Sequence, residues 1–225
     1  MSNNDSFIEE VTEEVRRDKL FALYRKYGWI PVAVVLLVVG GAAYNEWRKA
    51  SAEAAAEALG DAVMTALEVP EAEGRAAALA KVPVDGSGAE TFMALLRAAS
   101  EAEASDRDAA LAQLDAIASR SDVAAPYREL AQLKAVILRG SDQDRSERMA
   151  ILEHLSRAGA PFRVLAMEQK ALTLFEFGNN DEAIAVLRMV LDEPNATQGL
   201  LQRAQQLIVA MGGSLSDGNE AGTEG

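Results

Sequence analysis

The 225-residue chain contains no cysteine and only one histidine, His154. The absence of cysteine excludes disulfides, thiolate zinc sites and cysteine nucleophiles. A lone histidine cannot build a multi-histidine metal site, and no motif arranges a serine and an acid around it. His154 lies between Leu152 and Leu155 in a predicted helix, where it is expected to be a surface or interface side chain. We therefore expect no enzyme, no cofactor, no metal and no small-molecule substrate.

Basic residues are also scarce. Lysine and arginine number 22 against 35 aspartates and glutamates, which gives a net charge of −13 at pH 7. Such a surface repels nucleic acid, and no stripe of basic and aromatic side chains argues otherwise. The acidity favours solubility, or attraction to basic segments of partners. No nucleic-acid partner is expected.

Long apolar runs are absent except for one, from Trp29 to Tyr44, which carries no charge. With its flanks this run approaches the ~20 residues that a helix needs to cross roughly 30 Å of hydrocarbon. Trp29, Tyr44 and Trp47 stand at its two ends, where amphipathic rings favour the headgroup region. The pattern predicts a single transmembrane helix over 29–47.

Two other interpretations of this run remain open. A cleavable signal peptide would use Gly41 and Ala43 as the small residues before the cut, but 28 residues that include four glutamates precede the apolar core, against a short basic region in signal peptides. A buried soluble helix is disfavoured because the run is apolar on all its faces.

The flanking charges predict the orientation. Basic residues are in excess before the run, so the positive-inside rule places the N-terminus in the cytoplasm and the rest, in a bacterium, in the periplasm. The protein is thus expected in the bacterial inner membrane. The N-terminal segment is either an amphipathic helix on the cytoplasmic surface or a short frayed helix that only supplies these charges. The topology residues are Arg16, Arg17, Lys19, Arg25 and Lys26.

Beyond the apolar run the chain is rich in alanine and reads as helix throughout. No segment shows period-two alternation, so the predicted fold class is all-α. A stalk helix is expected to continue to Leu67, and the Pro83–Gly88 segment breaks the chain. Helices are predicted near 71–81, 89–103, 106–119, 126–139, 144–157, 161–177, 181–192 and 197–211.

Helix ends carry their own signals. Ser105 with Asp108, and Ser141 with Asp144, are predicted to form pairs that resemble capping boxes. Gly140 and Gly178 stand where helix C-terminal glycines belong. Pro161 is predicted in a first helical turn.

The segment from Pro161 to Pro194 resembles a tetratricopeptide repeat, a helix–turn–helix of about 34 residues. With Gly178 as the turn glycine, Ala171 and Ala183 fall at the small positions where paired helices approach closely. Leu174, Leu187 and Val190 occupy the larger positions that fill the gap between the paired helices. A weaker match to the same pattern lies upstream, at Ala98, Ala110, Leu114 and Ile117. The prediction is a TPR-like solenoid of helical hairpins, with an irregular helical bundle as the alternative. The predicted repeat-packing residues are Ala98, Ala110, Leu114, Ile117, Ala171, Leu174, Gly178, Ala183, Leu187 and Val190.

The predicted organisation therefore has five parts. The last helix is expected to cap the array, since an exposed last repeat would leave apolar area in water. The small, acidic C-terminal residues are read as disordered. The parts are a cytoplasmic amphipathic segment (1–28), a transmembrane helix (29–47), a helical stalk and linker (48–88), a TPR-like repeat domain (89–211) and a disordered acidic tail (212–225).

Two local segments stand out in this architecture: Tyr44-Asn45-Glu46-Trp47 just past the span, and Gly178-Asn179-Asn180-Asp181-Glu182-Ala183 at the turn. Together with these segments, the architecture resembles the YfgM-type family. Its members are ancillary subunits of the bacterial SecYEG translocon. The resemblance implies a scaffold that is anchored in the inner membrane and assists exported, unfolded chains and periplasmic chaperones beside the translocon. The alternative is an accessory or assembly subunit of another inner-membrane complex, respiratory, photosynthetic or of cell division.

Overall fold

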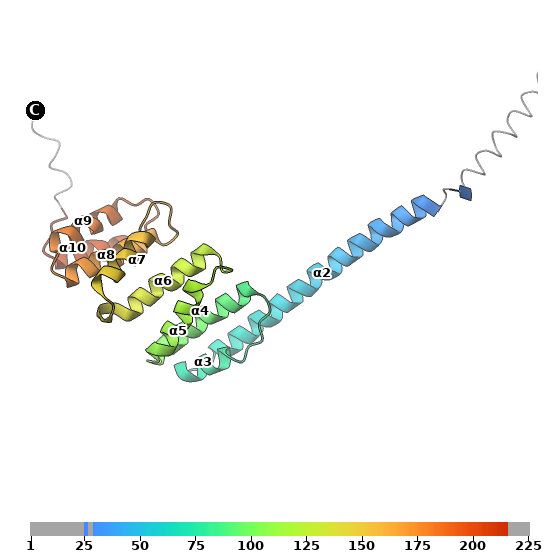
Figure 1. Ribbon diagram of the computed structural model, residues 1–225, viewed down its shortest axis with the longest axis horizontal. Coiled ribbons are helices and arrows are strands. Elements are labelled where there is room, and N and C mark those ends of the chain that lie inside the picture. Colours follow the sequence, from blue (N-terminus) through green and yellow to red (C-terminus); the bar gives the residue numbers. More distant parts are fainter. Residues whose placement is uncertain (1–24, 27–28, 216–225) are drawn as a thin grey trace, which may run out of the picture. The chain divides into compact units, whose positions relative to one another are not determined.

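The computed structural model describes residues 25–26 and 29–215, and the chain divides into two units, 1–61 and 62–225. Every regular element in the described part is a helix, which confirms the all-α prediction (Figure 1). The elements are α2 (Trp29–Leu67), α3 (Ala72–Leu79), α4 (Ser87–Glu103), α5 (Arg107–Ser119), α6 (Ala125–Arg139), the 3₁₀ turn η1 (Gly140–Asp142), α7 (Arg145–Leu155), α8 (Arg163–Glu176), α9 (Asn180–Leu191) and α10 (Gln198–Ala210).

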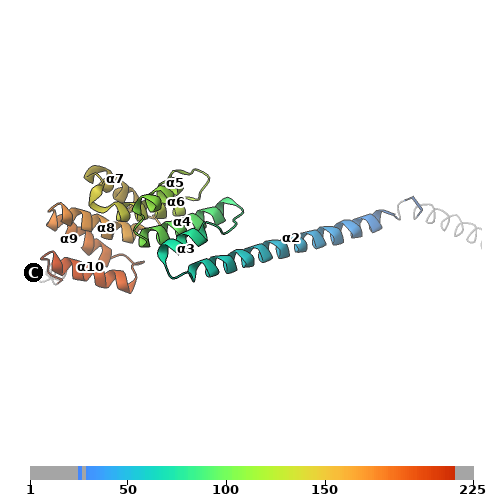
Figure 2. The ribbon, with the colours of Figure 1, turned by 90° about the horizontal axis from the view of Figure 1, so that it is seen from below.

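The predicted helix bounds agree with the structure to within two residues at every end from α3 to α10. The segment between α3 and α4, around Pro83 and Gly86, breaks the helices as predicted; Gly86 has a φ of 90°, which favours glycine. The first unit holds α2 up to residue 61, and Figures 1 and 2 draw α2 as one unbroken helix. Gly60 does not interrupt it.

In the second unit, α3 to α10 pack mainly against their neighbours in sequence, and α4 also contacts α6. The buried side chains form three successive cores. The first joins α4, α5 and α6, the middle one joins α6, α7 and α8, and the last joins α8, α9 and α10. Both views show α8, α9 and α10 side by side (Figures 1 and 2).

Helix α6 links the first two cores because its apolar residues lie on two faces. Ala131 and Ala135 belong to the first core, whereas Leu133 and Val136 belong to the middle one. Helix α8 repeats the arrangement, with Ala166 in the middle core and Met167, Ala171 and Leu174 in the last. Each of these two helices therefore buries more than the single stripe that a surface helix presents.

The predicted capping pair of Ser105 and Asp108 is wrong. Asp106 is the N-cap of α5, and its carboxylate accepts a hydrogen bond from the Ala109 N–H at 3.2 Å. Ser105 instead ends α4 with a φ of 64°, in the left-handed region. The connection is so short that one residue must reverse the chain, which leaves its neighbour to cap the next helix.

The second predicted pair is also wrong, because Asp144 is itself the N-cap of α7. Its carboxylate accepts from the backbone N–H groups of Ser146 and Glu147, at 2.9 and 3.1 Å. Ser141 lies within η1. Pro161 precedes the α8 N-cap, Phe162, rather than lying in the first turn. The turn glycines are as predicted, since Gly140 and Gly178 have φ values of 52° and 78°.

Candidate functional site

The apolar stretch of α2 is the most unusual surface in the described part of the chain. Residues 29–47, at about 1.5 Å of rise each, extend over roughly 28 Å, close to the thickness of a bilayer core. Helix α2 is long and apolar enough to cross a membrane, and none of its apolar window is buried. The exposed large side chains include Val34, Val35, Leu36, Leu37, Val38 and Val39. Surfaces that face water rarely expose so many neighbouring apolar residues.

Aromatic side chains stand at both ends of this stretch. Trp29, Tyr44 and Trp47 are each about two-thirds exposed. The rings of Tyr44 and Trp47 pack at a tilt with centroids 6.1 Å apart. Of the predicted topology residues, Arg25 and Lys26 are exposed just before the stretch, while Arg16, Arg17 and Lys19 lie outside the described residues.

The predicted repeat-packing residues lie in two cores of the second unit. Ala98, Leu114 and Ile117 belong to the first core, and Ala110 on α5 is fully buried. The others, Ala171, Leu174, Ala183, Leu187 and Val190, all belong to the last core. Ala171 and Ala183 have no exposed area, so neither has room for a larger side chain without displacement of its neighbours.

Gly178 is the exception, because it lies exposed at the turn between α8 and α9. Its N–H donates to the Phe175 carbonyl, and the Asn179 N–H donates to the Leu174 carbonyl, both at 2.9 Å. This pair of bonds is a Schellman motif, which requires a left-handed residue at the glycine position. The turn thus ends α8 sharply and starts α9 after it.

Pattern reasoning missed a set of arginine–carboxylate pairs between helices. In the second half of the chain the partners stand 28 to 35 residues apart, about one helical hairpin. That recurrent separation was the signal in the sequence that could have revealed the pairs. It is hard to recognise because other charged residues lie between the partners. The pairs are Arg148–Glu176 (2.7 Å), Arg157–Glu129 (2.6 Å), Arg163–Glu193 (2.7 Å) and Arg203–Glu168 (2.8 Å).

One member of these pairs is often buried. The Arg148 side chain is 6% exposed and that of Glu168 is 7% exposed. Arg203 reaches Glu168 with two nitrogens, at 2.8 and 3.1 Å, and this contact raises the pKa of the Arg203 guanidinium. Because a buried charge without a partner is costly, each pair restricts how its two helices can move apart.

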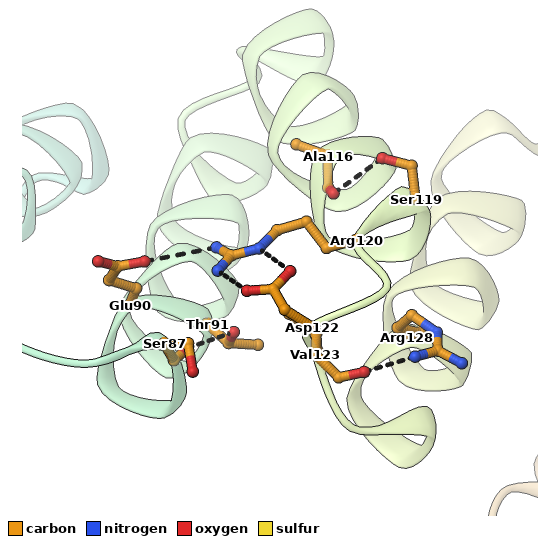
Figure 3. A network of polar contacts seen from close by, with 9 residues as sticks. All are labelled: Ser87, Glu90, Thr91, Ala116, Ser119, Arg120, Asp122, Val123 and Arg128. Carbon is orange, nitrogen blue, oxygen red and sulfur yellow. Dashed lines mark hydrogen bonds and ion pairs between the residues drawn. The ribbon is translucent and has the colours of Figure 1, made fainter.

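A further network joins the end of α5 to α4 (Figure 3). The Arg120 guanidinium donates to both Asp122 carboxylate oxygens, at 3.1 and 2.6 Å, and also reaches Glu90 on α4 at 3.5 Å. The hydrogen bonds from Arg120 hold the pKa of Asp122 below its ordinary value, and Asp122 in turn raises the pKa of Arg120. The contact ties the loop between α5 and α6 to α4.

Several hollows open on the second unit, including two that lie between its helices or their connections. The larger, of 930 Å³, lies between the α7–α8 and α9–α10 connections and is lined by residues that include Phe162, Leu165 and Asn195. The smaller, of 270 Å³, lies between α4 and α6 and is called the α4–α6 groove below. Its lining is almost wholly apolar apart from Lys134.

The described residues contain no group of three or more histidines, aspartates and glutamates that could hold a metal ion. His154 is exposed on α7. No protein-family model, no curated protein and no solved structure matches the chain.

Proposed function

We propose that this protein is a non-enzymatic interaction scaffold, anchored in the bacterial inner membrane by one helix, with a TPR-like repeat domain on the periplasmic side. The observation that carries the proposal is α2. The same helix bears the exposed apolar stretch and, in its last turns, the buried Val63 and Ala66. A membrane would cover the apolar surface that no part of the described chain covers.

The packing pattern supports a repeat array in the second unit. Arrays of helical hairpins bury their apolar faces between neighbours, so each element contacts those next to it in sequence. Helices α3 to α10 pack in this way, with cores that follow one another along the chain. The small residues Ala171 and Ala183 lie in one core on paired helices, at the spacing of the tetratricopeptide pattern.

The Sec translocon is the partner that we propose, on the resemblance of the anchor flank and the α8–α9 turn to the YfgM-type family. A scaffold beside the translocon would meet exported chains and periplasmic chaperones as they emerge. An acidic surface would attract basic, unfolded segments, and charge of this kind mainly raises the association rate. Such encounters should weaken with salt, because exposed charges are screened beyond about 8 Å at physiological ionic strength.

Crosslinking of the full-length protein in intact membranes, followed by mass spectrometry, tests this function. Translocon subunits and exported chains should be captured only when the anchor and the repeats are both present. A variant with an unrelated span separates the contributions: persistent capture assigns recognition to the repeats, and lost capture assigns it to the span or the N-terminal segment. Reproducible recovery of a different membrane complex without Sec subunits would replace the translocon by that complex.

Topology has its own test. Alkaline phosphatase folds only outside the cytoplasm, so a fusion after Gly225 should be active, and a reporter that works only in the cytoplasm should be silent there. The expected difference is all-or-none, because the basic excess before α2 places the N-terminus inside. The reverse pattern would overturn the periplasmic assignment.

A further inference from the structure

The α4–α6 groove combines an apolar floor with one cation. Ala98 and Leu114 are buried at its floor, each with about 3% of its surface exposed, and Ala102 adds a methyl group. At the rim, Ala99 is exposed and Ile137 is 50% exposed. An isoleucine with half its surface in water forgoes part of the free energy that burial would provide.

Lys134, also on the rim, has no hydrogen bond or ion pair to any described residue. The carboxylates on the neighbouring stretch of α4 are already engaged. Glu101 lies 3.5 Å from Arg97, and Glu103 pairs with Arg75 of α3. In a chain of net charge −13, an unmatched ammonium beside an apolar groove is the local exception. Lys134 is exposed, so a carboxylate on a partner could reach it and complement its charge.

We propose that the α4–α6 groove binds an amphipathic α-helix of a protein partner, which lays an apolar stripe on the alanine floor and pairs an aspartate or glutamate with Lys134. This inference rests on the proposed function as a protein-interaction scaffold and names the chemistry of its partner. The cavity of 270 Å³ takes one or two apolar side chains.

The shape of the groove favours a helix over an extended segment. Its lining residues recur at helical spacing on two helices, with Ala98 and Ala102 on α4, and Lys134 and Ile137 on α6. Such rows form ridges, and a third helix can pack its own ridge between them. Small side chains on the floor let the backbone of the incoming helix approach closely. Recognition of this type places anchors at positions i, i+3 or i+4, and i+7.

A display library of amphipathic helices provides the probe. The helices carry random residues on one face and are selected on the full-length protein in lipid nanodiscs, either wild type or Lys134→Glu. The wild type should enrich one acidic position flanked by large apolar residues at helical spacing. Lys134→Glu should enrich lysine or arginine at that position, and synthetic helices from the wild-type selection should bind it at least tenfold more weakly.

Two matched variants separate the groove from general surface effects. Ile137→Asp should abolish binding of the selected helices, whereas Met189→Asp, which alters an equally exposed side chain on α9, should leave binding unchanged. Lys81→Glu controls for the same reversal of charge elsewhere on the surface. Circular dichroism melts of each variant identify any that fails to fold. If Lys134→Glu fails to fold, the Lys134→Gln variant, which keeps the size of the side chain, replaces it.

Three results would overturn the proposal. Selected helices could show no charge preference, or they could keep their affinity for Ile137→Asp. Alternatively, Ile137→Asp could convert a dimer of the free protein into a monomer, which would make a second copy the occupant. Failure of the proposed function is distinguishable: if membrane crosslinking still recovers the same partner from Lys134→Glu and Ile137→Asp, the scaffold stands and the groove assignment falls.

Discussion

The exposed part of α2 and the helices that follow it differ in how they treat their apolar side chains. Those in this part of α2 are largely exposed, whereas many of those in the following helices are buried in shared cores. Within the apolar stretch of α2, none of the described residues is buried. In the second unit, from Ala62 onward, even the charged Arg148 is buried, and it is paired with Glu176. Apolar side chains that no other residue covers gain free energy only from an apolar environment outside the protein. A buried charge, in contrast, depends on a partner within the fold.

The largest expected effect tests the first half of that comparison. Leu37→Arg places a charge in the middle of the apolar stretch, where it costs about 2.5–3.5 kcal/mol in a bilayer. The ratio of inserted to non-inserted protein should fall by about 100-fold, measured by alkaline carbonate extraction of membranes. Ala55→Arg, on the exposed continuation of the same helix, is the control and should stay membrane-bound. Equal extraction of the two variants would contradict a membrane span.

The next effect concerns a fully buried alanine in the last core. Ala183→Leu overpacks the site where α9 meets α8 and should cost about 1–3 kcal/mol of unfolding free energy. Ala185→Leu, on the exposed face of the same helix, should change stability little. Urea unfolding curves of the two variants measure the difference. Similar midpoints would argue against the packing role of the small residue.

A smaller, asymmetric effect is expected at the buried ion pair of α7 and α8. Glu176→Gln leaves the Arg148 guanidinium buried without a carboxylate, and should cost about 1–3 kcal/mol. Arg148→Met should cost less, because the Glu176 side chain is 37% exposed and water can solvate it. Thermal melts give both values, with Glu68→Gln as an exposed control. A larger loss for Arg148→Met would reverse the argument.

The smallest effect is a loss of stability in acid. The hydroxyl of Ser146 and the N–H of Glu147 hold the pKa of Asp144 below its ordinary 3.8, and Arg120 does the same for Asp122. A lowered folded-state pKa stabilises the fold above about pH 3.8, and this contribution disappears as the pH falls through the lowered value. The melting temperature should therefore drop below about pH 4, and less steeply in Asp144→Asn. Asp85→Asn, on an exposed loop, should not change the slope.

How much of this could be predicted differs between local and distant features. The helices were predictable because glycines, prolines and short polar connections mark their ends, as at Gly140 and Gly178. The exchange of roles between Ser105 and Asp106 was not, because it depends on the chain reversing within a three-residue connection. The pairing of Arg203 with Glu168 was hidden by 35 residues of separation and by other carboxylates equally eligible in sequence.

The α4–α6 groove lay beyond the sequence for a related reason. Ala98 and Leu114 were expected to pack between helices, and they do lie in the first core. Lys134 and Ile137 flank the same hollow because of the rotation of α6 about its own axis. The two buried faces of α6 together fix that rotation. A periodic pattern indicates one buried face, and a helix with two such faces blurs that pattern.

Most pairs between the helices use arginine, although Lys170 pairs with Glu153 between α8 and α7, and this preference has a chemical consequence. A guanidinium keeps its proton far into alkali, where a lysine ammonium begins to lose its own. At Arg203 the hydrogen bond and the charge of Glu168 raise the guanidinium pKa further, so this side chain keeps its charge in alkaline solution. The contact between α8 and α10 therefore keeps its positive partner at alkaline pH, where a lysine in the same place would begin to lose its proton.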